Sequence, residues 1–155
     1  MTKYVRYCEY KVDSGNIINC QSLRKIKDDI TCYYENNKRK ETAFSGTLEI
    51  VAGKGAIFSS SIRQIIHSLD DINLEKQSTT FRQICMVVCR SESKDESLAR
   101  HIRNSFSHWN FYLKKCGGAY RLLLLDFTEG GNISAVICCP LKSLKKLANL
   151  YSNLA

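Results

Sequence analysis

Arg103 and His108 lie five positions apart in the segment RNSFSH, and these two residue types together suit the cleavage of RNA. Arginine stays charged and binds phosphate oxygens through two parallel donors. Histidine titrates near neutral pH and suits proton transfer. RNA carries its own nucleophile, the 2′-hydroxyl beside each phosphate. Cleavage therefore needs no metal ion if one group takes the 2′ proton, another stabilises the phosphoryl charge and the groups are held in line.

The motif is expected on a helix that begins near Ser93. Ser93 and Glu96 form a capping box, in which the serine caps the helix and the glutamate bonds back. Apolar residues at three- and four-residue spacing then predict one stripe along the helix: Leu98, Ile102, Phe106, Trp109 and Leu113. Arg103 and His108 lie off this stripe, roughly 140° apart around an ideal helix and about 7.5 Å apart along it. Two copies related by a twofold axis would bring both pairs into one cleft.

The motif and its neighbourhood resemble the HEPN family (higher eukaryotes and prokaryotes nucleotide-binding domains). The family's mark is an arginine followed four to six residues later by a histidine, often with asparagine directly after the arginine, as in Arg103, Asn104 and His108. Some bacterial members continue into a hairpin and a last helix, and the stretch from Ser93 to Leu150 is similar to that arrangement. The resemblance implies a mainly α fold: a HEPN-like helical bundle with a short C-terminal β-hairpin and a final helix, as a single domain over residues 1–155.

The resemblance also implies a metal-independent endoribonuclease without a cofactor, in agreement with the chemistry of the residues. His108 would be the base or the acid toward the leaving 5′-oxygen, with its twofold mate available for the other task. Arg103 would neutralise the transition state, and Asn104 would orient the phosphate or the histidine. The expected partners are RNA, a second copy in a homodimer, and an antitoxin or defence-system protein. The expected setting is a toxin, phage-defence or stress role.

Plainer interpretations stand beside the catalytic one. Some HEPN domains are non-catalytic nucleotide-binding, RNA-binding or interaction modules, and a pure interaction subunit of a larger complex is a third class. His108 could be a core or interface histidine, and Arg103 could form a structural ion pair with an acid such as Glu96. His67 and His101 are interpreted as surface or packing residues.

Two positions depart from the family pattern. Toxins of this family that are modified by a nucleotidyltransferase antitoxin commonly carry a tyrosine two residues after the histidine. Asn110 occupies that position here, and the nearest tyrosine is Tyr112, which argues against such modification. Many relatives with the hairpin have glycine just after the histidine, where this chain has Trp109. A bulky residue there would either narrow the cleft or join the dimer contact.

The composition points to one globular domain with an anionic partner. The chain has 155 residues, 44% hydrophobic and 25% charged, with a formal net charge of +8. Arg100, Lys114 and Lys115 flank the motif helix and are the candidate RNA-binding residues. The run at 38–40, Lys-Arg-Lys, is interpreted as a solvated loop.

Other classes of protein fit the sequence poorly. No apolar run approaches the roughly 18 residues of a membrane span, and the first residues lead into no signal-peptide core. No cysteine or histidine spacing completes a zinc site, and no phosphate-binding glycine loop is present. A cytoplasmic protein with reduced thiols is therefore expected, since five of the eight cysteines sit in apolar runs typical of a core: Cys32, Cys85, Cys89, Cys138 and Cys139.

The remaining elements are expected to be mostly helical. Helices are predicted at residues 20–36, 60–69 and 81–89, whereas 47–58 could be strand or helix. Near the end of the chain, 119–127 and 133–139 form a predicted hairpin around the turn 128–132. Pro140 then suits the first turn of a final helix. Its leucine edge consists of Leu141, Leu144, Leu147, Leu150 and Leu154, with Lys142, Lys145 and Lys146 on the other side.

Overall fold

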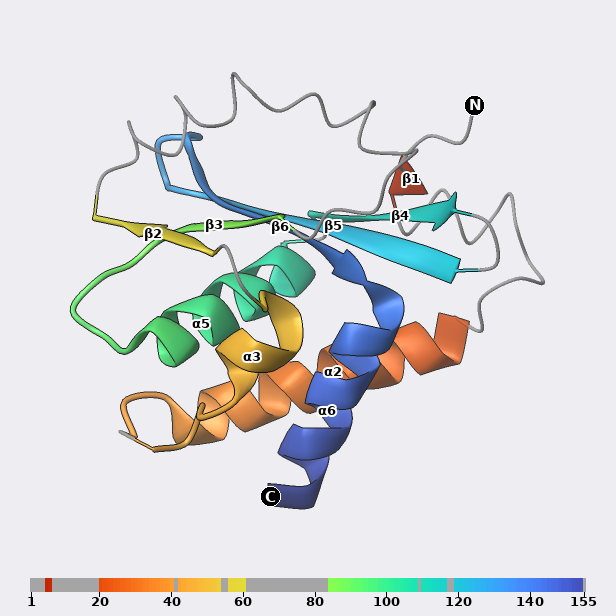
Figure 1. The fold of residues 1–155 in the computed structure, drawn as a ribbon, viewed down its shortest axis with the longest axis horizontal. Helices are drawn as coiled ribbons and strands as arrows, with labels where there is room; N and C mark the ends of the chain where they lie inside the picture. The colour runs from red at the N-terminus through yellow and green to blue at the C-terminus, as the bar shows by residue number, and fades with distance from the viewer. Residues whose placement is uncertain are drawn as a thin grey trace.

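A sheet covered on one face by helices forms the framework of the protein (Figure 1). The computed structural model describes residues 5–6, 20–40, 42–53, 56–60, 84–108, 110–116 and 119–154. Within this part the helices are α2 (Cys20–Asn37), α3 (Thr47–Val51), α5 (Lys94–Ser107) and α6 (Leu141–Leu154). Figure 1 shows all four of them on the same side of the sheet.

The sheet brings together strands from distant parts of the sequence. Its described strands are β1 (Val5–Arg6), β2 (Ile57–Ser59), β3 (Ile84–Val88), β4 (Phe111–Cys116), β5 (Ala119–Phe127) and β6 (Ile133–Pro140). Their order in the sheet is β1-β4-β5-β6-β3-β2, with β2 parallel to β3 and the other neighbours antiparallel. The β5–β6 hairpin therefore occupies the middle of the sheet and carries β3 on one side and β4 on the other.

Alternate residues of the central strands build the core beneath the helices. Side chains along a strand point to opposite faces in turn, and Leu122 and Leu124 of β5 join Ile137 and Cys139 of β6 in the main buried cluster. The helices contribute one face each, including Leu98, Ile102 and Phe106 of α5, which are fully buried. The motif helix is thus fixed against the sheet by its apolar stripe.

The expectation of a mainly α, HEPN-like helical bundle is wrong, because the structure is mixed α/β. The predicted hairpin is present, but it is the centre of a wider sheet rather than an appendage to a bundle. The predicted helix at 81–89 is also wrong, since Ile84–Val88 forms β3 and pairs with β6. A short apolar run without periodicity fits a buried strand as well as a buried helix, and here a free sheet edge decides between them.

The predicted apolar stripe is correct for three of its members and too long at its end. Leu98, Ile102 and Phe106 are buried on α5, but the helix ends at Ser107. Leu113 lies on β4, opposite Leu122 of β5. Trp109 lies outside the described residues.

The other predicted elements divide as follows. Helix 20–36 is confirmed as α2, the hairpin as β5 and β6, and the final helix as α6. The ambiguous stretch 47–58 contains both a helix, α3, and a strand, β2. Most of the predicted helix 60–69, including His67, lies outside the described residues. No helix in the described part of the chain is long and apolar enough to cross a membrane.

Candidate functional site

The first turn of α5 is tied to two neighbouring segments. Ser93 caps the helix by accepting the backbone N–H of Glu96 at 3.1 Å, which confirms the serine half of the predicted capping box; the bond from Glu96 back to Ser93 is replaced by one to another segment. The Glu96 carboxylate accepts the backbone N–H of Arg39, just after α2. The Asp95 carboxylate accepts the backbone N–H of Leu48 in α3 at 2.8 Å. Both acids also suit the positive end of the helix dipole. The motif helix therefore has a fixed position relative to α2 and α3.

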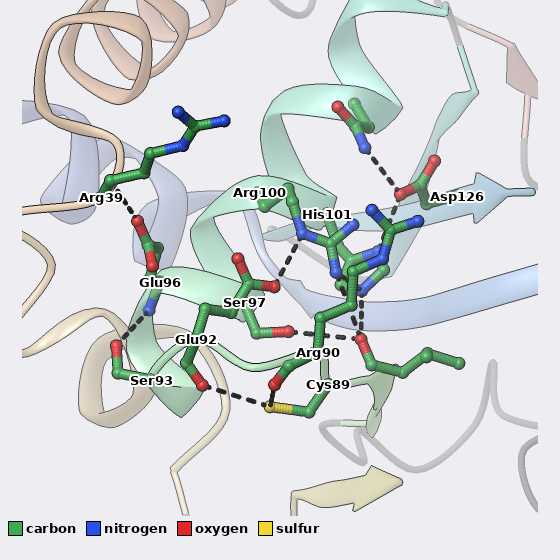
Figure 2. A network of polar contacts seen from close by, with 12 residues as sticks. Arg39, Cys89, Arg90, Glu92, Ser93, Glu96, Ser97, Arg100, His101 and Asp126 are labelled. Atoms are coloured by element: carbon green, nitrogen blue, oxygen red, sulfur yellow. Dashed lines mark hydrogen bonds and ion pairs between the residues drawn. The ribbon is translucent and has the colours of Figure 1, made fainter. Parts of the chain in front are cut away.

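Beneath the middle of α5 lies a buried pair formed by His101 and Asp126 (Figure 2). Nδ1 of His101 is 2.7 Å from Oδ2 of Asp126, and Nε2 of His101 is 2.7 Å from the carbonyl oxygen of Val88. Both side chains are almost inaccessible, at 1% and 4% exposure. Both ring nitrogens are therefore engaged, and Nη2 of Arg100 also lies 3.2 Å from Nε2 of His101. His101 is thus a packing residue, as predicted, but it has a charged partner on β5.

The carbonyl of Val88, at the end of β3, accepts hydrogen bonds from several side chains of α5. Besides His101, it accepts hydrogen bonds from the Ser97 hydroxyl at 3.3 Å and from Arg100 Nη2 at 3.4 Å. Arg100 also donates through Nε to Glu92 at 2.8 Å. These bonds fix α5 along the end of β3.

Asp126 is held in its ionised form by the groups around it. Burial raises the pKa of this carboxyl, but hydrogen bonds from His101 and Asn104, the charge of His101 and the backbone N–H of Phe127 outweigh burial. The pKa of Asp126 therefore lies below its ordinary value. Asn104 donates to Oδ2 of Asp126 at 3.1 Å, so the second residue of the motif is anchored on the sheet. An amide nitrogen carries two hydrogens, so the other remains available to a ligand.

Arg103 is held at the surface by α2. Its guanidinium carbon is 5.0 Å from the centre of the Tyr34 ring, and its Nε is 3.2 Å from Oε1 of Glu35. The Nε is close enough to Glu35 for ion pairing, yet it is not aligned for a hydrogen bond. The ion pair that Arg103 makes is therefore with Glu35, not with Glu96. The Arg103 side chain as a whole is 24% exposed and borders a cleft, although its Nε is buried.

His108 sits in the tight connection between α5 and β4. It is the C-cap of α5, with its backbone N–H bonded to the carbonyl of Asn104 at 3.0 Å, and its side chain is exposed. The connection is closed by Asn110, which donates its backbone N–H to Ser105 at 2.8 Å. The rings of Phe106 and Phe111, 4.8 Å apart, pack across it. His108 is therefore presented to solvent from a well-anchored turn.

The predicted catalytic residues line one depression of a single chain, which we name the motif cleft. Its volume is about 510 Å³, and its lining includes Arg90, Arg100, Arg103, Asn104, His108 and Asp126. Arg103 and His108 thus share a cleft without a second chain. A cleft of this size reaches both side chains although His108 is the C-cap of α5, with its backbone N–H still bonded to Asn104.

The predicted RNA-binding residues lie on different elements of the structure. Arg100 lines the motif cleft, as expected for a residue that meets the substrate. Lys114 and Lys115 lie on β4, where they pair with Arg121 and Tyr120 of β5 rather than extending the motif helix.

Two residues of the site, Asp126 and Arg90, were not predicted from the sequence. Asp126 and its contact with His101 depend on β5 lying under α5, although a single acid ending the apolar run LLLLDF is a usable signal. Arg90 joins the cleft because β3 ends beside α5. Among the described residues, no group of three or more His, Cys, Asp or Glu side chains is arranged to hold a metal ion.

Comparison with protein-family models, with curated proteins and with solved structures gives no match to this chain.

Proposed function

We propose that this protein is a metal-independent endoribonuclease whose active site is the motif cleft. The observation that carries the proposal is the convergence of Arg103, Asn104 and His108 on one cleft bordered by further arginines. The likeness of this motif to that of HEPN ribonucleases supports the same use of the residues, on an α/β framework instead of a helical bundle. We place the activity in the cytoplasm, in a toxin, phage-defence or stress role.

In the proposed reaction the 2′-hydroxyl attacks the adjacent phosphorus and the bond to the 5′-oxygen breaks. The products are a 2′,3′-cyclic phosphate and a free 5′-hydroxyl. His108 transfers one proton, since its exposed ring has no hydrogen-bond partner within the described part of the chain. Arg103 stabilises the negative charge on the phosphoryl oxygens, held in place by Tyr34 and Glu35. Asn104, anchored on Asp126, orients the phosphate.

The reaction needs a second proton-transfer group, and the cleft of one chain does not supply an accessible one among its described histidines. His101 lines the same cleft, but both of its ring nitrogens are engaged and it is buried. A homodimer, in which the twofold mate of His108 takes the second task, meets this need. Pairing through an identical patch is also the commonest oligomeric arrangement.

The second candidate function is a non-catalytic RNA-binding module. The observation that favours it is the engagement of Arg103 by Tyr34 and Glu35. An arginine that holds α5 against α2 in this way need not act in catalysis. An assay of RNA cleavage in excess EDTA separates the two functions.

The purified protein is expected to cut single-stranded RNA in excess EDTA. Product analysis should detect 2′,3′-cyclic phosphate ends, because the nucleophile belongs to the substrate. A substrate with 2′-O-methyl groups should resist cutting, since its hydroxyl is blocked. An inert wild type, tested against varied RNAs including tRNA, would remove the enzyme proposal and leave the binding module in its place.

A shared active site is expected to show in a complementation test. Mixing an Arg103→Ala chain with a His108→Ala chain yields heterodimers in which one composite cleft keeps one arginine and one histidine. Cutting should recover in part relative to either variant alone. A strictly monomeric wild type that cleaves at full rate contradicts the dimer proposal.

A further inference from the structure

A second depression adjoins the motif cleft, and we name it the loop cleft. It has a volume of about 680 Å³ and lies between the end of α2 and the segment leading into α5. Its lining contains six basic side chains and two acidic ones, Glu92 and Glu96. The basic residues are Lys38, Arg39, Lys40, Arg90, Arg100 and Arg103.

The two clefts share one wall. Arg90, Arg100 and Arg103 line both of them, and we name these three residues the arginine wall. The loop cleft reaches Ser93 at the start of α5, and the motif cleft reaches His108 at its end. At 1.5 Å per residue these ends of α5 are on the order of 20 Å apart. A free phosphate or a mononucleotide is too short for that span, whereas an extended strand of a few nucleotides can follow it.

Much of the positive charge in the loop cleft has no acidic partner in the described part of the chain. Arg100 is paired with Glu92, while Lys38 and Arg103 both contact Glu35. The side chains of Arg39, Lys40 and Arg90 make no ion pair among the described residues. All three are exposed, so their charges are available to a polyanion.

The loop that carries Arg39 has a defined backbone. Arg39 adopts a left-handed conformation with φ 69°, and its backbone N–H is bonded by Glu96 of α5. In Figure 2 the Arg39 side chain extends away from this bond, and no dashed line reaches its guanidinium. The interpretation of the 38–40 run as a solvated loop is therefore incomplete, because the structure holds the run beside the arginine wall.

We infer that single-stranded RNA bound in the motif cleft crosses the arginine wall and continues into the loop cleft, where Arg39 and Lys40 bind phosphates. This inference rests on the proposed function and adds a second subsite to it. Phosphate contacts of this kind set the position of a strand without reading its sequence. The substrate class is thus single-stranded RNA several nucleotides long, with little base preference at the second subsite.

The test is the binding of 2′-O-methyl RNA, which cannot be cut, measured by fluorescence anisotropy. An octanucleotide is compared with a dinucleotide on wild type and on the double variant Arg39→Gln with Lys40→Gln. We expect the double variant to bind the octanucleotide about tenfold more weakly, with dinucleotide affinity changed less than twofold. Because each phosphate contact on a single strand contributes about 0.7 to the salt dependence, the slope of log K against log salt should become shallower by roughly 1.4.

A matched control removes the same charge elsewhere. Lys142 and Lys146 are exposed on α6 and border a different hollow, so Lys142→Gln with Lys146→Gln lowers the net charge equally. This control should change octanucleotide affinity less than twofold, and melting temperatures check that both double variants fold. Equal loss in the control, or wild-type binding by the Arg39/Lys40 variant, overturns the inference.

The cleavage and binding measurements together distinguish a failure of the second subsite from a failure of the enzyme proposal. If wild type does not cut RNA but binding depends on Arg39 and Lys40 as described, the second subsite stands and the enzyme proposal fails. If wild type cuts RNA and the Arg39/Lys40 variant binds and cuts as wild type does, the enzyme proposal stands and the second subsite fails. Failure of the octanucleotide to bind wild type at all overturns the inference as well.

Discussion

His108→Ala is expected to reduce single-turnover RNA cleavage by about 10²–10⁴-fold, the range typical for loss of a general acid–base group. The fold should survive, because the side chain is exposed and the turn is held by the backbone bond of Asn110 and by Phe106 packing on Phe111. Cleavage is measured at saturating enzyme, and melting temperature is measured beside it. Cleavage by His108→Ala at the wild-type rate would contradict a catalytic role.

Arg103→Ala is expected to reduce the rate of RNA cleavage by about 10²–10³-fold, as for the loss of a charge-stabilising donor in the transition state. Arg103→Lys should restore little, because lysine lacks the planar pair of donors. Arg103 also packs on Tyr34 and pairs with Glu35, so a control must separate catalysis from structure. Glu35→Gln removes the ion partner and keeps the guanidinium.

The Glu35→Gln variant should cleave RNA only a few-fold more slowly than wild type, and its free energy of unfolding should change little. The Arg103–Glu35 pair is partly exposed, and such pairs contribute about 0–1 kcal/mol. A Glu35→Gln variant as inactive as Arg103→Ala would mean that the arginine acts through the packing of α2 on α5. In that event the non-catalytic binding module becomes the better explanation.

The second large effect is expected on stability. Asp126→Asn should lower the free energy of unfolding at pH 7 by about 3–5 kcal/mol, since it removes one partner of a buried ion pair and leaves His101 facing an amide. Urea unfolding measures the change. The matched control is Glu129→Gln, an exposed residue of the hairpin turn, which should shift the value by no more than about 0.5 kcal/mol.

The destabilisation caused by Asp126→Asn should become smaller at low pH. The pKa of Asp126 is lowered in the folded protein, whereas an unfolded aspartate titrates near 3.9. Its stabilising contribution is therefore complete above the unfolded value and is lost as the pH falls through the lowered folded pKa. The difference between wild type and Asp126→Asn should therefore shrink progressively as the pH is lowered below about 4. A constant difference across this window would show that lost packing, not lost charge, causes the destabilisation.

The sequence by itself determined the elements whose signals are local. The capping serine at Ser93 marks the start of α5 because its hydroxyl accepts the backbone N–H of Glu96 in the turn that follows it. Helical spacing identified α2 and α6, and the turn at 128–132 identified the hairpin. The spacing of Arg103, Asn104 and His108 located the motif, but it predicted that Arg103 and His108 need a second chain to share a cleft, whereas both line the motif cleft of one chain.

The tertiary structure decided whatever depends on partners far along the chain. The apolar run Ile84–Val88 is compatible with helix or strand, and it became β3 because the edge of β6 offered hydrogen bonds to it. Asp126 is an unremarkable acid in the sequence and becomes the anchor of His101 and Asn104 only when β5 lies beneath α5. The lysine and arginine run at 38–40 came to line the loop cleft in the same way, since Glu96 bonds the backbone of Arg39 beside the arginine wall. Local periodicity describes one segment, whereas these contacts arise from the pairing of segments through the sheet and the helix layer.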